Sequence, residues 1–225
     1  MTLSAENPRA HQSPSAAGRT IVVAGAGGAA GRAVCAALTE AGARVIALSS
    51  RAGSLTHIAA AETVVIDAAD AEQVAAWAES LRNAGTHIDG LIHLVGGWRP
   101  GVSDDDWQWL ERRVLTTLRV LSRELRDDLS ESSEGRLAIV SAASLAAPRW
   151  GMANYVALKA AAEAWVQALA NGWRVKGTPT AAVTFVAEQL DDAVINRLAA
   201  ACVGLWTVPH AELNGAVLDL RESVS

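Results

Sequence analysis

The sequence predicts a single-domain α/β fold in which a doubly wound, parallel, seven-stranded sheet carries helices on both faces. From Thr20 onward, short apolar runs alternate with segments of helical periodicity, which is typical of βαβ units and a parallel sheet. The 225 residues fit one domain of this class and can bury a large core. A glycine-rich turn follows the first apolar run, where doubly wound sheets bind their ligands.

Seven apolar runs are expected to form the strands, because each is short and is bounded by turn residues. They span residues 20–25, 43–48, 62–67, 88–96, 136–142, 180–186 and 215–220.

Helical patterns fill the intervals between these runs. The first helix is expected to end at Gly42, a residue suited to a left-handed cap, and Asp70 to cap a helix with Gln73 at the capping-box position. The apolar residues of 104–129 recur every three or four places and predict one long amphipathic helix. The later helices are expected at 70–84, 104–129, 152–175 and 189–202.

The composition excludes several function classes. No stretch approaches the roughly 20 apolar residues of a membrane span, and a formal charge of −5 argues against sequence-independent nucleic-acid binding. Cys35 and Cys202 lack metal-ligand spacing, so we expect buried cysteines and no metal site. Residues 1–19, rich in Ser, Ala and Pro, are expected to be a disordered tail, the folded domain to cover 20–222, and the protein to be cytoplasmic.

The turn after the first strand predicts nucleotide binding. Gly25, Gly27, Gly28, Ala29 and Gly31 are small enough for a pyrophosphate to reach the backbone N–H groups at the start of the helix. The alternative is a tight strand-to-helix turn without a ligand.

The residues after the second strand favour NADP(H) over NAD(H). NAD-preferring proteins of this fold carry an acid there for the ribose 2′-hydroxyl, whereas this chain has Ser50 and Arg51. A guanidinium and a hydroxyl suit a 2′-phosphate. The alternative is that Arg51 is a solvated loop residue.

Tyr155 and Lys159 form the candidate catalytic pair. Tyr155 is the only tyrosine in the chain, and Lys159 lies four residues later on the same face of the predicted helix. A nearby ammonium lowers the pKa of a phenol from its usual value of about 10 and suits it to acid–base catalysis. The alternative is a surface tyrosine beside a lysine.

Together these motifs resemble the short-chain dehydrogenase/reductase family and its Rossmann-type fold. Ala24 to Gly31 is similar to the family's TGxxxGxG turn, with Ala29 in place of the middle glycine, and Tyr155 and Lys159 match its YxxxK pattern. The resemblance implies an NAD(P)H-dependent oxidoreductase acting on a small molecule. It also implies that Asp67, Gly96 and Lys159 contact the cofactor and that the chain forms a homodimer or homotetramer.

Two residues depart from the family pattern. Ala142 stands where the family has its catalytic serine, with Ser141 and Ser144 nearby, and Ser144 is taken as its replacement. Val114 stands where the family has an asparagine. These departures leave open a second reading, a catalytically degenerate protein that acts as a dinucleotide-binding regulator or partner subunit.

A narrower resemblance concerns the substrate. The segment Val95–Trp98 and the GMxxY pattern that ends at Tyr155 are similar to segments of dihydropteridine reductases, which also lack the serine. It implies a flat heterocycle such as a quinonoid dihydropterin, with a carbonyl compound as the alternative. Trp98 and Trp150 are expected to stack on such a substrate.

Overall fold

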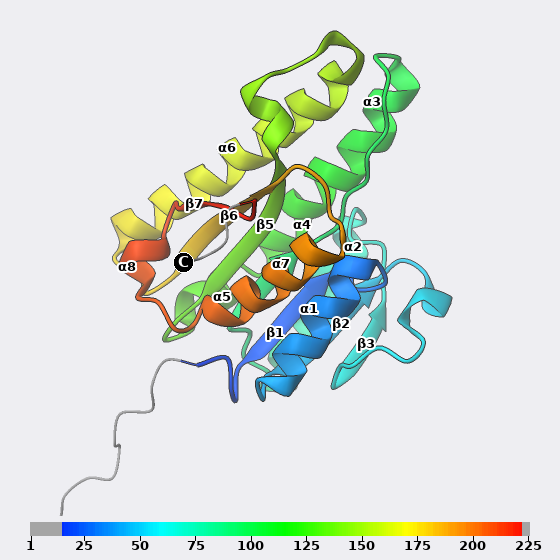
Figure 1. The fold of residues 1–225 in the computed structure, drawn as a ribbon. Coiled ribbons are helices and arrows are strands. Elements are labelled where there is room, and N and C mark those ends of the chain that lie inside the picture. Colours follow the sequence, from blue (N-terminus) through cyan, green and yellow to red (C-terminus); the bar gives the residue numbers. More distant parts are fainter. Residues whose placement is uncertain (1–14, 222–225) are drawn as a thin grey trace, which may run out of the picture.

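The computed structural model describes residues 15–221 and confirms the predicted fold class (Figure 1). All adjacent strands pair in parallel, in the order β3-β2-β1-β4-β5-β6-β7. The strands are β1 (Thr20–Ala24), β2 (Arg44–Ser49), β3 (Glu62–Val65), β4 (Gly90–His93), β5 (Arg136–Ala142), β6 (Ala181–Ala187) and β7 (Val217–Asp219).

Helices cover both faces of this sheet. On one face, α1 and α7 pack against the strands through residues such as Val34 and Leu198, and on the other α2, α3 to α5 and α6 pack through residues such as Val74, Leu121 and Val166. The helices are α1 (Ala29–Glu40), α2 (Ala71–Asn83), α3 (Asp104–Glu111), α4 (Thr117–Glu124), α5 (Arg126–Glu131), α6 (Ala153–Lys176), α7 (Asp192–Gly204) and α8 (His210–Leu213). The result is a three-layer domain with an apolar core on each side of the sheet.

The two predicted helix-end signals are confirmed. The Asp70 carboxylate accepts the N–H groups of Glu72 and Gln73 at 3.1 Å each, so it satisfies two donors at the start of α2. The Gln73 amide returns a hydrogen bond to Asp70 at 2.7 Å. Gly42 has a φ of +83° just after α1, a conformation that costs glycine little.

The prediction of one continuous helix over 104–129 is wrong. A π-helical turn, Arg112–Thr116, separates α3 from α4, and a break at Leu125 separates α4 from α5. The apolar side chains on either side stay buried, because Leu110, Leu118 and Leu129 all face the sheet. Hydrophobic spacing alone therefore conceals the widened turn.

The ordered domain begins earlier than residue 20. Ala16 is 1% exposed in the core, and the Gly18 N–H donates to the Gly42 carbonyl at 2.9 Å. Residues 15–19 therefore pack on the fold, which corrects the tail boundary expected at 19. Residues 1–14 of that tail, and residue 222 of the expected domain, lie outside the described residues.

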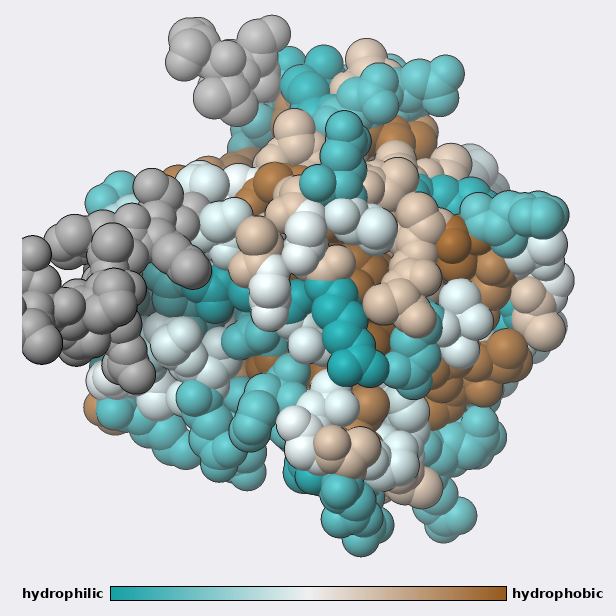
Figure 2. Space-filling view, turned by 90° about the horizontal axis from the view of Figure 1, so that it is seen from below, coloured by the Kyte–Doolittle hydropathy of each residue, from teal (hydrophilic) through white to brown (hydrophobic). Residues whose placement is uncertain are grey.

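The outer surface is mixed in character. Figure 2 shows hydrophilic and hydrophobic residues interspersed over the face seen from below. Within 15–221, no helix combines the length and the apolar character that crossing a membrane requires.

The strand order defines where a ligand can bind. β1 pairs with β2 on one side and with β4 on the other, so the strand order runs from β1 to β3 in one direction and from β4 to β7 in the other. In open parallel sheets, such a switch point creates a crevice beyond the carboxyl ends of the strands. The ends of β1, β2, β4 and β5 bring the predicted site residues to this crevice.

Candidate active site

Two adjoining cavities occupy the crevice. The first, of about 460 Å³, lies over the ends of β1 and β2, and the second, of about 900 Å³, lies beside the ends of β4 to β6. Leu94, Val95 and Gly96 line both, so the segment after β4 is their common wall. This places the predicted cofactor residue Gly96 at the junction.

The glycine-rich turn needs its small residues. Gly25 has a φ of +82°, and a Cβ there would lie 2.7 Å from the Leu94 carbonyl carbon. A Cβ on Gly31 would lie 2.3 Å from the Gly25 carbonyl oxygen. These contacts exclude larger residues because they involve backbone atoms, which cannot rotate away.

Three of the five predicted turn residues line the first cavity, namely Gly25, Gly27 and Gly28. Gly31 is buried beneath them, whereas Ala29 is exposed and is not among the residues that line either cavity. Gly28 caps α1 without a side-chain acceptor, and the first turn of α1 carries no acid. The positive end of α1 therefore suits an anion such as a diphosphate.

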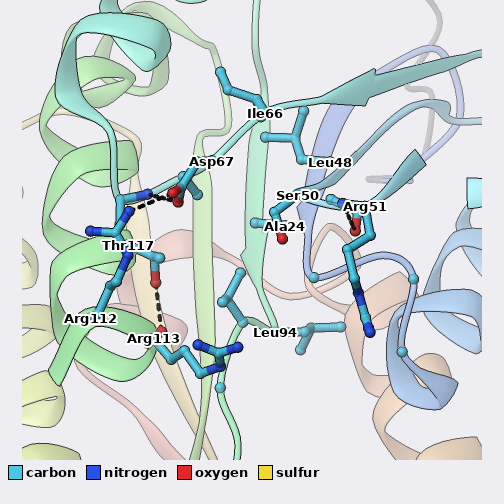
Figure 3. Close-up of a pocket in the computed structure, with 18 residues that line it drawn as sticks. Ala24, Leu48, Ser50, Arg51, Ile66, Asp67, Leu94, Arg112, Arg113 and Thr117 are labelled. Atoms are coloured by element: carbon cyan, nitrogen blue, oxygen red, sulfur yellow. Dashed lines mark hydrogen bonds and ion pairs between the residues drawn. The ribbon is translucent and has the colours of Figure 1, made fainter. Parts of the chain in front are cut away.

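The end of β2 presents hydroxyl and guanidinium groups to the first cavity. Ser50 and Arg51 both line it, on the side opposite Arg112 and Arg113 (Figure 3). Hydrogen bonds fix the loop: the Arg51 N–H donates to Ser49 Oγ at 3.2 Å, and Ser54 Oγ donates to the Arg51 carbonyl at 2.7 Å. This chemistry fits a phosphorylated ribose.

Asp67 lines the same cavity, and it also has structural partners. Its Oδ1 accepts the Ala69 N–H at 3.0 Å, and its Oδ2 pairs with Arg112 Nη2 at 2.5 Å. It is the only carboxylate among the described residues lining this cavity. Because Arg112 neutralises it, it offers little repulsion to a bound phosphate.

Tyr155 and Lys159 line the second cavity together. Lys159 Nζ donates to the Val140 carbonyl at 2.7 Å and lies 5.9 Å from the centroid of the Tyr155 ring. Burial lowers the pKa of Lys159 to about 8, partly opposed by the charge of Glu163. The hydrogen bond to β5 therefore holds the ammonium beside the phenol.

The pKa of Tyr155 shifts in the direction opposite to the expected one. Burial raises it above its usual value, since a phenolate loses hydration among apolar neighbours. The charge of Lys159 does not reverse this effect.

Ser141 and Ser144 present buried hydroxyls without partners in the described chain, and both residues line the second cavity. A buried hydroxyl of this kind requires a partner such as a ligand or an ordered water. Ala142, in the serine's place, lines the cavity too, whereas Val114 is 3% exposed within the core. The structure therefore leaves Ser144 available for substrate binding.

The two tryptophans expected to bind substrate differ in position. Trp98 lines the second cavity and remains 61% exposed, which leaves its ring available for stacking. Trp150 is 80% exposed and is not among the lining residues, although its neighbours Arg149 and Met152 are. The short 3-10 turn Trp150–Met152 (η4) leaves the Trp150 ring exposed to solvent, and its stacking on a substrate stays a prediction.

Sequence reasoning missed His93, Arg113 and Gln189 as lining residues. His93, expected to be a packed core histidine, is indeed buried, and its Nε2 lies 2.9 Å from Thr117 Oγ1. Its position at the carboxyl end of β4 was the available signal, because ligands of such sheets bind there.

Comparison with known proteins decides the family. A model of the short chain dehydrogenase family matches residues 19–187, more than half of the chain. The chain belongs to the short-chain dehydrogenase family. Members of this family are NAD(P)-dependent oxidoreductases.

Two relatives of this short-chain dehydrogenase are each 30% identical to it. One is 2,3-dihydro-2,3-dihydroxybenzoate dehydrogenase of Escherichia coli (strain K12), matched over 148 residues, 64% of this chain and 59% of that enzyme. The other is peroxisomal multifunctional enzyme type 2 of Mus musculus, matched over 161 residues, 63% of this chain and 22% of that protein. The chain thus spans less than two thirds of either relative.

A solved structure from Pseudomonas syringae, described as a short chain dehydrogenase, has the same fold. It superposes with a TM-score of 0.82 at 20% identity and covers 94% of this chain and 98% of its own.

The pKa of Lys159 leads to a pH-dependent stability. Below pH about 8, Lys159 is protonated in both folded and unfolded chains, and the folded protein bears the cost of the buried charge. Between about 8 and 10.5, the folded chain releases the proton that the unfolded chain retains, so stability rises with pH. Relative to Lys159→Met, the wild-type free energy of unfolding should rise by about 1 to 3 kcal/mol over this window. Urea unfolding of both proteins from pH 7 to 10.5 measures it, and a constant difference would contradict the assignment.

Proposed function

We propose that this short-chain dehydrogenase is an NADP(H)-dependent reductase in which Tyr155 is the proton donor and Lys159 holds it in place. The observation that carries the proposal is the placement of both residues on a cavity of about 900 Å³ that shares a wall with the nucleotide-sized cavity. A substrate in the second cavity then lies next to a dinucleotide in the first.

Each residue of the site has a different role in the proposed reaction. When bound, NADPH supplies a hydride. Tyr155 donates a proton to the oxygen or nitrogen of the double bond that is reduced, so that a hydride and a proton are added together. The Lys159 ammonium stabilises the phenolate left behind, and the unpartnered Ser144 hydroxyl is available to donate to the same substrate atom.

The proposed substrate is a flat heterocycle such as a quinonoid dihydropterin. Trp98 offers an exposed ring at the cavity wall, and Ala142 leaves the place of the family's serine without a hydroxyl, so Ser144 is the remaining donor from that segment. A quinonoid ring needs less polarisation, because its reduction restores a more stable conjugated system. Ring carbonyl compounds are the alternative, and the E. coli relative is named for a ring compound.

The test is NADPH oxidation with quinonoid dihydropterin and with a panel of quinones. We expect turnover with at least one flat ring substrate and none with simple aliphatic ketones. Turnover of aliphatic ketones alone would overturn the proposed substrate class.

The second candidate function is a dinucleotide-binding regulator. Two observations favour it: Val114 faces the core where the family has an asparagine, and Ala142 stands where the family has its catalytic serine. This candidate prevails if NADPH binds but no ring substrate is turned over and Tyr155→Phe changes neither binding nor partner association.

The residues at the end of β2 predict the cofactor preference. We expect NADPH to bind about tenfold more tightly than NADH, since one charge-assisted contact to the 2′-phosphate contributes this much at an exposed site. Arg51→Met should remove the difference by weakening NADPH binding alone. Arg44→Met is the matched control, because Arg44 lies at the other end of β2, paired with Glu62 outside the cavity. Calorimetric titration of the three proteins measures it, and equal losses for NADPH and NADH would contradict the role of Arg51.

A further inference from the structure

The π-helical turn Arg112–Thr116 places two consecutive arginines on the first cavity. In a regular α-helix, successive side chains point about 100° apart, so neighbours seldom serve the same site. Here Arg112 and Arg113 both line the cavity, together with Thr117. Widened turns of this kind occur frequently at functional sites.

The two arginines have different partners. Arg112 pairs with Asp67 at 2.5 Å. Arg113 has no carboxylate partner in the described part of the chain; its guanidinium stacks over the ring of Trp109, 4.3 Å from the centroid. Stacking orients a guanidinium while leaving its in-plane N–H groups free to donate. Arg113 is therefore an oriented cation at the cavity whose charge is not neutralised by a neighbouring acid.

Buried hydrogen bonds fix the backbone from which Arg113 projects. Thr117 Oγ1 donates to the Arg113 carbonyl at 2.7 Å, so its lone pair accepts from His93 Nε2 at 2.9 Å. Burial lowers the pKa of His93 to about 3, so the ring remains neutral, and this hydrogen bond requires the tautomer that carries its proton on Nε2. These two hydrogen bonds, from His93 on β4 to Thr117 and from Thr117 to the Arg113 carbonyl, hold the widened turn against the sheet.

We propose that Arg113 binds the diphosphate of the dinucleotide and closes it against the glycine-rich turn. The inference rests on the proposed NADP(H) binding. Across the cavity, Ser50 and Arg51 are placed to take the 2′-phosphate, whereas Arg113 extends toward Leu94 from the opposite side (Figure 3). The diphosphate, seated at the start of α1, is the anion between these two sides.

The test is calorimetric titration of Arg113→Met with NADPH and with NADH. Both affinities should fall about tenfold, since both cofactors carry the diphosphate and one exposed charge-assisted contact is lost. The loss should shrink in about 1 M salt, where the Debye length is about 3 Å. Arg113→Lys, which keeps the charge without the planar stack, should lose less than Arg113→Met.

Arg119→Met is the matched control. Arg119 also stacks on a tryptophan, 5.5 Å from the centroid of the Trp165 ring, but it is not among the residues that line either cavity, so its loss should leave both affinities unchanged. Unchanged binding by Arg113→Met overturns the proposal, and weaker binding of NADPH alone reassigns Arg113 to the 2′-phosphate and overturns it as well. If the wild type binds neither cofactor, it is the proposed function that fails.

Discussion

Tyr155→Phe is expected to lower the turnover number about a thousandfold, because general acid catalysis contributes roughly 10² to 10⁴ and no other phenol exists in the chain. The substitution removes only the hydroxyl and keeps the ring that packs beside Lys159. Steady-state NADPH oxidation with the best ring substrate measures the effect.

Two controls separate chemistry from folding in this variant. The dissociation constant for NADPH should stay within about twofold of the wild type, since Tyr155 lines the second cavity and not the first, where the dinucleotide is proposed to bind. The unfolding midpoint should not fall, because the hydroxyl has no hydrogen-bond partner in the described chain to lose. Turnover that survives the substitution would remove Tyr155 from the catalytic role.

Gly31→Ala is expected to destabilise the protein by about 3 kcal/mol and to abolish tight dinucleotide binding. The new Cβ would lie 2.3 Å from the Gly25 carbonyl oxygen and 2.6 Å from the Ala26 Cα. Because both are backbone atoms, α1 must move away from the turn that carries Gly25. Urea unfolding and NADPH titration measure the two effects.

The matched control is Gly172→Ala, the same substitution in α6. A Cβ on Gly172 meets no atom within 4 Å, so alanine should raise stability by about 0.5 to 1 kcal/mol through its better helix propensity. Two glycine-to-alanine changes within helices should thus act in opposite directions. A stable Gly31→Ala protein that binds NADPH as the wild type does would contradict the packing of the turn.

The sequence predicts best where a local rule and the global fold agree. The apolar run before Gly25 becomes β1, and the carboxylate of Asp70 caps α2 as its spacing to Gln73 indicates. These features depend on neighbours within a few residues, so composition and periodicity reveal them.

Composition and periodicity do not reveal features that depend on contacts between residues far apart in the sequence. The packing of residues 15–19 depends on contacts that are remote in sequence, such as the hydrogen bond from the Gly18 N–H to the Gly42 carbonyl. The π-helical turn preserves the apolar spacing of a continuous helix, so that spacing does not reveal it. Trp150 shares its segment with the lining residues Arg149 and Met152, and only the turn Trp150–Met152 decides that its ring is exposed. The hydrogen bond by which His93 supports the π-helical turn likewise depends on Thr117, which lies on α4 and is remote in sequence.

The measurement that tests the central claim most directly is calorimetric titration of the wild-type protein with NADPH. The joined cavities predict one saturable site per chain with a dissociation constant in the micromolar range, and tighter binding than NADH. Failure to bind either dinucleotide at millimolar concentration would contradict the assignment of the first cavity and, with it, the pairing of Tyr155 and Lys159 with a bound cofactor.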